Sequence, residues 1–258
     1  MSRRGKHFKE PKVNRVKVAC IIIFFISTSY IVYYLCTIYK NSQNDNKILS
    51  NIIIQDTQIA KGKTERILQV EELKKENTDI VGWIEIENTN INYPVLQATD
   101  NDYYISRNYK KEDSKDGSIF LDKDYNWEIP STNLLLYGHN NKNGTMFQNL
   151  MNYVSEDYYK AHPTVRFTTI SEDATYEIIS VFLSRVYYIN ETDVFRYYYF
   201  INANTKGEFD YYINESKKAS LYDTGKTAEY GDQLLTLSTC EYSEEDGRLA
   251  VVLKKIKN

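Results

Sequence analysis

The stretch "LSTCEYSEEDGRLAVVL", from Leu237 to Leu253, contains two apolar, strand-like runs separated by a short acidic loop. Cys240 ends the first run, and Arg248 opens the second run eight positions later. A loop of this length is typical of neighbouring antiparallel strands, in which the end of one strand lies beside the start of the next. The stretch therefore predicts that a thiol and a guanidinium meet at one rim of a β-structure.

Similar β-branched or aromatic runs recur along the chain, joined by turns, and they favour a closed barrel or a sandwich. These runs span residues 81–87, 91–97, 117–122, 133–138, 165–169, 174–189, 233–239 and 249–256. Helical spacing of apolar residues predicts one helix over residues 64–77, through Ile67, Val70 and Leu73, and another over residues 144–153, through Met146, Leu150 and Tyr153. A further helix is expected within residues 209–221, inside a long connection over residues 190–232.

An N-terminal membrane anchor is predicted from the distribution of charge. Residues 18–39 contain no charged side chain, and as a helix they would span about 33 Å, enough for a hydrocarbon core. Residues 1–17 carry seven basic residues and one acidic residue, although the 258-residue chain has a net charge of −3. This basic flank predicts a single-pass protein with a cytoplasmic tail (1–17), an uncleaved anchor (18–39), a stalk and N-terminal helix (40–75) and an extracellular body (76–258).

The predicted topology makes the cysteine count informative. Cys20 and Cys36 fall within the anchor, so Cys240 is the only thiol of the exported body and has no intramolecular disulfide partner there. A lone cysteine in an oxidising compartment is either a buried inert residue or a reactive thiol. Reactive thiols need a basic partner and a donor to the developing oxyanion.

His139 and Arg248 are the candidates for those two roles. His139 follows the apolar run 133–138 and should emerge at a strand end, whereas His162, just before Pro163, is better explained as a structural residue. Each candidate has a simpler explanation. Cys240 could be a small buried hydrophobe, and Arg248 could pair with the neighbouring acidic residues Glu244, Glu245 and Asp246. Together, the three residues indicate a cysteine nucleophile assisted by a histidine and an arginine.

Other kinds of site are not supported. The acidic body has no basic stripe, which argues against nucleic-acid binding. The run that starts at Asp122 resembles the beginning of a calcium loop, but Trp127 and Asn133 stand where glycine and a bidentate glutamate are needed. The sequence shows no dinucleotide fingerprint, phosphate-binding loop or zinc spacing, so no metal or cofactor is predicted.

The chain resembles the sortases, and class B in particular, over roughly residues 76–258. The resemblance rests on "TLSTC" (236–240) followed by Arg248, on "LLLYGHNNKNGTMF" upstream, and on "GWIEI", "INYPVLQATDNDYYI" and "GSIFLD". It implies an eight-stranded barrel with an N-terminal helix and a helix in the long connection before the cysteine strand. It also implies a membrane-anchored transpeptidase of the Gram-positive cell surface. Members cut a C-terminal sorting signal of secreted proteins after its threonine, and class B members commonly favour signals resembling NPxTx. They then join the threonine to an amine of a cell-wall precursor of the lipid II type.

The resemblance also implies residue roles. Cys240 would be the nucleophile, His139 the general acid and then the general base, and Arg248 the donor to the oxyanion. Substrate contacts are implied for Ser238 and Glu241, which flank the cysteine in its motif, and for Tyr104 and Ile105, which match a pocket-lining Tyr-Leu pattern with isoleucine in place of leucine.

Three alternatives remain at this point. A membrane-anchored cysteine protease would use the same nucleophile with water as the acceptor. A pilus-type sortase often carries a lid and a second C-terminal hydrophobic segment, and this sequence, which ends in "KKIKN", shows neither. A surface adhesin built on a β-barrel would be unaffected by replacement of Cys240.

Overall fold

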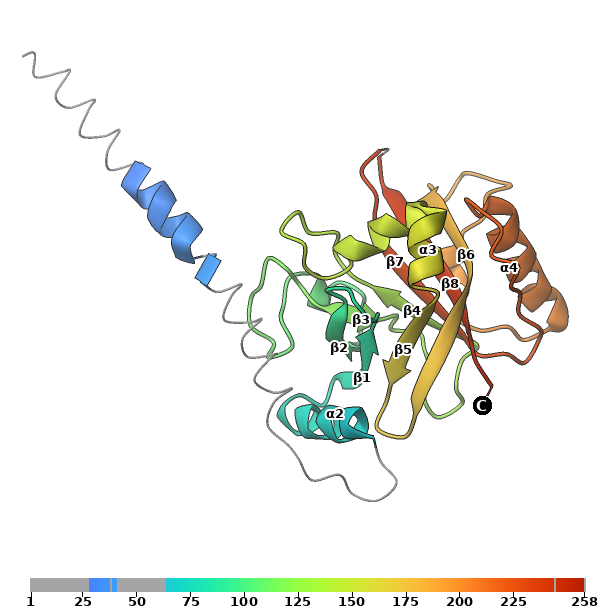
Figure 1. Ribbon diagram of the computed structural model, residues 1–258, viewed down its shortest axis with the longest axis horizontal. Helices are drawn as coiled ribbons and strands as arrows, with labels where there is room; N and C mark the ends of the chain where they lie inside the picture. Colours follow the sequence, from blue (N-terminus) through green and yellow to red (C-terminus); the bar gives the residue numbers. More distant parts are fainter. Residues whose placement is uncertain (1–27, 38, 41–63, 244, 258) are drawn as a thin grey trace, which may run out of the picture. The chain divides into compact units, whose positions relative to one another are not determined.

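The computed structural model of the protein describes residues 28–37, 39–40, 64–243 and 245–257 (Figure 1). The chain divides into two compact units, Met1–Ile54 and Gln55–Asn258. In the first unit, residues 28–37 are helical. Among the described residues, no helix has both the length and the apolar character needed to cross a bilayer. The predicted tail (1–17), the anchor residues 18–27 and 38, and the stalk residues 41–63 lie outside the described residues, so the anchor stays a prediction.

The second unit is built on eight strands that close into a barrel, in the order β1-β2-β3-β4-β7-β8-β6-β5 (Figure 1). The strands are β1 (Ile80–Glu85), β2 (Asn92–Leu96), β3 (Ile119–Leu121), β4 (Asn133–Tyr137), β5 (Thr164–Thr168), β6 (Asp173–Arg185), β7 (Leu234–Cys240) and β8 (Gly247–Lys255). Each strand lies on one of the eight predicted runs. The structure therefore confirms the mainly β fold with helices, and it decides for a barrel over a sandwich.

The predicted run 174–189 is too long at its C-terminal end. Strand β6 ends at Arg185, which pairs with Gly247, the first residue of β8. Strand β8 has no residue before Gly247, because the chain turns at Asp246. The last hydrogen bond here runs from Val186 N–H to the carbonyl of Asp246, in the turn, at 3.0 Å. The residues that follow Arg185 therefore leave the sheet and form an irregular connection.

Strands β4 and β7 form a parallel pair in the middle of the strand order. Their register runs from Asn133 opposite Leu234 to Tyr137 opposite Ser238. Leu134, Leu135 and Leu136 of β4 are all buried, as are the first six residues of β7. Strands covered on both faces have near-continuous apolar runs instead of an alternating pattern. The parallel register brings the C-terminal ends of β4 and β7 side by side.

The N-terminal helix α2 (Glu65–Glu76) confirms the prediction for residues 64–77. The hydroxyl of Thr64 caps its first turn by accepting from Ile67 N–H, and the buried residues Ile67, Val70 and Leu73 form its inner face. Figure 1 shows α2 beside β1, with which it is in contact.

The predicted helix over residues 144–153 is wrong in type and extent. The chain instead forms a 3-10 helix, η2 (Gln148–Val154), followed by a short helix, α3 (Glu156–Ala161), which the sequence pattern did not indicate. Met146 has a positive φ of 56°, which is incompatible with a helix, and Phe147 is buried in its place. Leu150 and Tyr153 are fully buried, as the apolar spacing predicted.

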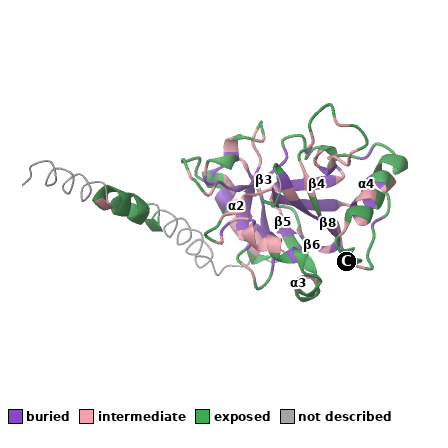
Figure 2. Cartoon of the chain, turned by 90° about the horizontal axis from the view of Figure 1, so that it is seen from above, coloured by how far each residue is buried: buried purple, intermediate pink, exposed green. Residues whose placement is uncertain are grey.

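The long connection over residues 190–232 covers the outer side of the barrel. It contains the 3-10 helix η3 (Tyr197–Tyr199) and helix α4 (Lys206–Ala219), which includes most of the predicted helical segment 209–221. Tyr197, Phe209 and Tyr212 are buried against β6, β7 and β8. Figure 2 shows the exposed side of α4 in green. Full burial of one such aromatic side chain contributes about 2–3 kcal/mol. This aromatic layer supports the outer face of the cysteine strand.

Candidate active site

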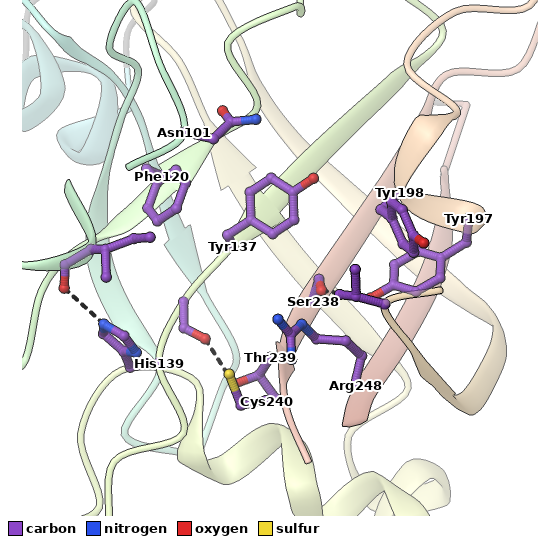
Figure 3. Close-up of a pocket in the computed structure, with 13 residues that line it drawn as sticks. Asn101, Phe120, Tyr137, His139, Tyr197, Tyr198, Ser238, Thr239, Cys240 and Arg248 are labelled. Atoms are coloured by element: carbon purple, nitrogen blue, oxygen red, sulfur yellow. Dashed lines mark hydrogen bonds between the residues drawn. The ribbon is translucent and has the colours of Figure 1, made fainter. Parts of the chain in front are cut away.

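Three neighbouring strands bring the predicted catalytic residues to one rim of the barrel. Cys240 of β7 lies directly opposite Arg248 of β8. On the other side of β7, Tyr137 of β4 is paired with Ser238. His139 and Cys240 each lie two residues further along the chain, so the parallel register brings them to the same end of the two strands. Side chains two residues apart on a strand point to the same face. In the view of Figure 3, the Cys240 sulfur lies between the imidazole of His139 and the guanidinium of Arg248.

These side chains open into one pocket with a volume of about 240 Å³ (Figure 3). Most of the exposed lining surface is apolar, and polar groups such as those of His139, Ser238 and Arg248 converge on it, which is typical of a ligand-binding site. The pocket is lined by Asn101, Ile105, Phe120, Tyr137, Gly138, His139, Val186, Tyr197, Tyr198, Ser238, Thr239, Cys240 and Arg248. The structure therefore gathers His139, Cys240, Arg248, Ser238 and Ile105 in one place.

The imidazole of His139 is held by a main-chain carbonyl. Its Nε2 lies 2.7 Å from the carbonyl oxygen of Ile105. A dashed line from the ring of His139 marks this hydrogen bond in Figure 3. A carbonyl oxygen can only accept, so Nε2 carries the proton in this arrangement. Gly117, at φ +62°, allows the close approach, because a Cβ there would lie 2.5 Å from the Ile105 oxygen and 2.9 Å from His139 Cδ2.

Cys240 is a free cysteine of intermediate exposure. Its carbonyl accepts a hydrogen bond of 2.9 Å from Asn140 Nδ2, the side chain next to His139 in sequence. The partial exposure rules out the simpler explanation that Cys240 is a fully buried hydrophobe. The thiol is thus accessible from the pocket.

Arg248 is anchored by its own main chain. Nη1 donates to the carbonyls of Gly247 at 2.8 Å and Asp246 at 3.3 Å. Among the described residues, no carboxylate forms an ion pair with Arg248, although Glu244 lies outside them. The alternative of a loop ion pair with Glu245 or Asp246 is therefore wrong.

The two residues that flank the cysteine motif have different environments. Ser238 lines the pocket, and its hydroxyl shares a 2.8 Å hydrogen bond with the hydroxyl of buried Tyr197. The carboxylate of Glu241 bonds instead to the hydroxyl and the N–H of Ser243, at 2.5 and 2.9 Å, and does not line the pocket. The structure thus places Ser238, but not Glu241, where a substrate in the pocket can touch it.

The prediction that Tyr104 lines the pocket is wrong. Its side chain is 1% exposed, donates to Asp79 Oδ2 at 2.7 Å and accepts from Asn77 Nδ2 at 3.1 Å. The 3-10 helix η1 (Tyr103–Ile105) turns neighbouring side chains to opposite sides, so Ile105 is 40% exposed and does line the pocket. Tyr104 therefore fixes the segment that presents Ile105 and its carbonyl to the site.

A buried carboxylate beneath the pocket was missed by the sequence reasoning. Asp122, 4% exposed, accepts from Tyr137 Oη at 3.0 Å, from Asn101 Nδ2 at 2.9 Å and from Asp124 N–H at 2.9 Å. Burial, the charge of Asp122 and this hydrogen bond raise the pKa of Tyr137 far above its ordinary value. Tyr137 is therefore a neutral hydroxyl group, and Asp122 fixes the orientation of two pocket-lining side chains.

The polar clusters among the described residues do not form a metal site. In the part of the chain that the structure describes, no group of three or more His, Cys, Asp or Glu side chains could hold a metal ion. His162 stacks on Tyr158 with a ring separation of 4.2 Å, and its Nδ1 donates to the Tyr158 carbonyl at 3.1 Å. The structural explanation for His162 is confirmed.

Comparison with known proteins gives a consistent family assignment. The Sortase domain family model matches residues 84–256. The chain is 35% identical to Sortase B of Listeria monocytogenes serovar 1/2a over 185 residues, which cover 71% of this chain and 72% of that protein.

Two solved structures extend the similarity to the fold. Sortase B of Bacillus anthracis in complex with AAEK1 is similar with a TM-score of 0.70 and 35% identity, covering 85% of this chain and 100% of that chain. A Staphylococcus aureus sortase B–substrate complex is similar with a TM-score of 0.71 and 28% identity, covering 85% and 97% of the two chains.

Proposed function

The chain belongs to class B of the sortase family, the cysteine transpeptidases, and from this premise we propose that it anchors secreted proteins to the Gram-positive cell wall. Its donor substrate in this proposal is a C-terminal sorting signal resembling NPxTx, and its acceptor is an amine of a lipid II-type peptidoglycan precursor. The observation that supports the proposal most is the shared pocket of His139, Cys240 and Arg248. A structural relative, a sortase B of Staphylococcus aureus, forms a complex with its substrate, which supports substrate binding by this fold.

The first half-reaction forms a thioester. The Cys240 thiolate attacks the threonine carbonyl carbon of the signal, and the electron pair of the carbonyl moves onto its oxygen. The oxyanion accepts hydrogen bonds from Arg248, whose planar, permanently charged guanidinium suits a two-pronged contact. Collapse of this intermediate breaks the scissile C–N bond, and protonated His139 gives its proton to the leaving amine.

The second half-reaction reverses these roles. Neutral His139 takes a proton from the incoming amine as the amine attacks the thioester carbonyl, and the thiolate of Cys240 leaves. The Ile105 carbonyl already holds the Nε2 proton of His139. This arrangement leaves Nδ1 as the ring nitrogen for proton transfer.

The proposal places the catalytic unit outside the cell on a single-pass anchor. It is supported by the uncharged run of residues 18–39 and the basic residues before it. Within this run, the described helix of residues 28–37 exposes large apolar side chains, among them Tyr30, Val32 and Leu35. Such a helix is suited to a lipid environment.

Intact-mass spectrometry of the detergent-solubilised full chain tests the reaction. The chain is mixed with NPxTx, LPxTG and related peptides, and then with triglycine or diaminopimelate. The expected result is an acyl adduct on Cys240 that the amine discharges to ligated peptide, and no adduct on the Cys240→Ala variant. An adduct released only by water would replace the proposal with a cysteine protease, and turnover by the Cys240→Ala variant would exclude the thioester.

A further inference from the structure

The loop that carries His139 and the strand that carries Cys240 are joined by side chains where their main-chain pairing ends. In the part of the chain that the structure describes, the last main-chain bond of this pair runs from Gly138 N–H to the Ser238 carbonyl at 3.2 Å. The hydroxyl of Thr239 then donates to the Gly138 carbonyl at 2.7 Å. One residue further, Asn140 Nδ2 donates to the Cys240 carbonyl at 2.9 Å.

A second bond runs in the opposite direction between the same two segments. The hydroxyl of Tyr242 donates to the carbonyl of Asn140 at 3.1 Å. Asn140 therefore bonds to Cys240 through its side chain and to Tyr242 through its main chain. The two bonds form a reciprocal clasp between segments about 100 residues apart in sequence.

The loop itself is closed without the clasp. The His139 carbonyl accepts from Phe147 N–H at 2.8 Å, and Asn140 forms an antiparallel bridge with Met146. Phe147 is fully buried and anchors the far end of the loop. These contacts set the shape of the loop, whereas its position relative to Cys240 depends on the bonds that cross to β7.

We propose that Asn140 and Tyr242 are positioning residues of the transpeptidation reaction, and that their clasp fixes the imidazole of His139 relative to the Cys240 thiol. This inference rests on the proposed function. Asn140 is covalently next to the histidine and hydrogen bonded to the main chain of the cysteine, so it links the two reacting groups by the shortest route. Neither Asn140 nor Tyr242 lines the pocket, so their effect on the reaction is through His139 and Cys240.

The chemistry of the contact requires a neutral donor at position 140. The Cys240 carbonyl is an acceptor, and an amide N–H satisfies it without adding charge beside the thiol. An aspartate of the same shape would set a negatively charged acceptor against that carbonyl. Tyr242 is 67% exposed, so the loss of its hydroxyl removes one hydrogen bond and little packing.

Steady-state kinetics of the detergent-solubilised full chain test the clasp, with a sorting peptide and triglycine as substrates. The variants are Asn140→Ala, Asn140→Asp and Tyr242→Phe. The matched control is Asn143→Ala, since Asn143 lies in the same loop but bonds to half-buried Asp116, 3.1 Å away, and to Thr145, and not to β7. The melting temperature of each variant is measured in parallel.

The expected result is a loss of kcat without a comparable change in KM. We expect Asn140→Ala to lower kcat about 10- to 100-fold, since a misplacement of about 1 Å costs roughly that much, with KM within about twofold. Asn140→Asp should lose at least as much. Tyr242→Phe should lower kcat about 3- to 10-fold, as one neutral hydrogen bond allows. The control should stay within about twofold of wild type.

The outcomes separate this inference from the proposed function. A wild-type chain that forms no amine-discharged product refutes the proposed function itself. If the wild type turns over, a kcat within twofold for both Asn140→Ala and Tyr242→Phe overturns the clasp, and so does a rise in KM alone. If Asn140→Ala does not fold, Tyr242→Phe decides, because an unchanged kcat in that variant also overturns the clasp.

Discussion

Cys240 and Arg248 face each other directly across β7 and β8. The two residues are only eight positions apart, and an antiparallel hairpin with this register brings them together by local folding. His139 reaches the same rim by a different route, through the parallel pairing of β4 with β7 across about 100 residues. The three proposed catalytic residues are thus brought together by one strand pairing that is local in sequence and one that is long-range.

Replacement of Arg248 by lysine separates charge from geometry. We expect Arg248→Lys to keep the fold and to lower kcat about 10²-fold or more, since a lysine ammonium cannot make the two-pronged contact with an oxyanion. The measurement is kcat for transfer of a sorting peptide to triglycine. Arg166→Lys is the control, because Arg166 pairs with Asp173 on the β5–β6 hairpin, and it should retain near-wild-type turnover. Near-wild-type turnover of Arg248→Lys would show that the side chain is not an oxyanion donor.

Replacement of Asp122 by asparagine tests the support beneath the pocket. All three groups that contact the Asp122 carboxylate are donors, and two of them meet the same oxygen. An amide is neutral and offers one acceptor oxygen, so the bonds from Tyr137 and Asn101 either weaken to bonds with an uncharged oxygen or are lost. We expect KM for the peptide to rise about 10-fold, the size of one lost hydrogen bond to a charged group, with a smaller change in kcat.

Asp124→Asn is the matched control for this experiment. Asp124 lies two residues away, is exposed, and pairs through its carboxylate with Lys123 at 2.7 Å. Its substitution should leave both KM and kcat unchanged. An unchanged KM in a folded Asp122→Asn variant would refute the role of Asp122 in orienting the pocket.

The stability of the barrel should fall in acid, in part through Asp79. Burial alone would raise the pKa of Asp79, but hydrogen bonds from Tyr104 and Lys111 and the charges of Lys111 and Lys74 outweigh it, so the pKa lies below its ordinary value. A carboxyl whose pKa is lowered by folding stabilises the protein above its unfolded pKa of about 4. This contribution is lost as the pH falls through the folded pKa.

Tyr104→Phe removes one of the groups that lower this pKa. We expect a lower urea midpoint at pH 7 than for wild type, and a smaller decrease of the midpoint between pH 5 and pH 3. Urea unfolding at pH 7, 5 and 3 measures both effects. If the urea midpoints of Tyr104→Phe and wild type fall by the same amount between pH 7 and pH 3, the tyrosine does not contribute to the loss of stability in acid.

Removal of residues 1–40 tests the proposed anchor. The full chain should fractionate with membranes, and the shortened chain should be soluble with unchanged kcat, since the pocket is formed entirely by residues 101–248. Cell fractionation and the transfer assay measure the two properties. A full chain found in the soluble fraction would contradict the anchor, and a folded but inactive short chain would give the N-terminus a further role.

The strands and the proposed catalytic set could be predicted from the sequence because their signals are local. Apolar runs bounded by turns mark the eight strands, and the cysteine and arginine lie within a single hairpin. The barrel, in contrast, depends on pairings such as β4 with β7, for which no local pattern exists. The resemblance to a known family, not the spacing of residues, supplied this part of the fold.

The errors have physical causes that a one-dimensional pattern cannot show. Met146 has the spacing of a helical residue, but the loop that closes at Phe147 forces it into a left-handed conformation. Tyr104 and Ile105 are neighbours, yet η1 directs one into the core and the other into the pocket. Asp122 has the sequence context of a calcium loop, but its partners in the structure, Tyr137 and Asn101, are 15 and 21 residues away.

The strand order also restricts when the enzyme can become active as the chain folds. Strands β7 and β8, over residues 234–255, lie between β4 and β6 in the closed barrel. Until they are in place, β4 and β6 each expose an unpaired edge, and unpaired edges of this kind associate readily with other chains. In a chain that is made N-terminus first, the segment with His139 is therefore available for folding long before the Cys240 thiol is fixed in the barrel. Reactivity of the Cys240 thiol would therefore report completion of the barrel.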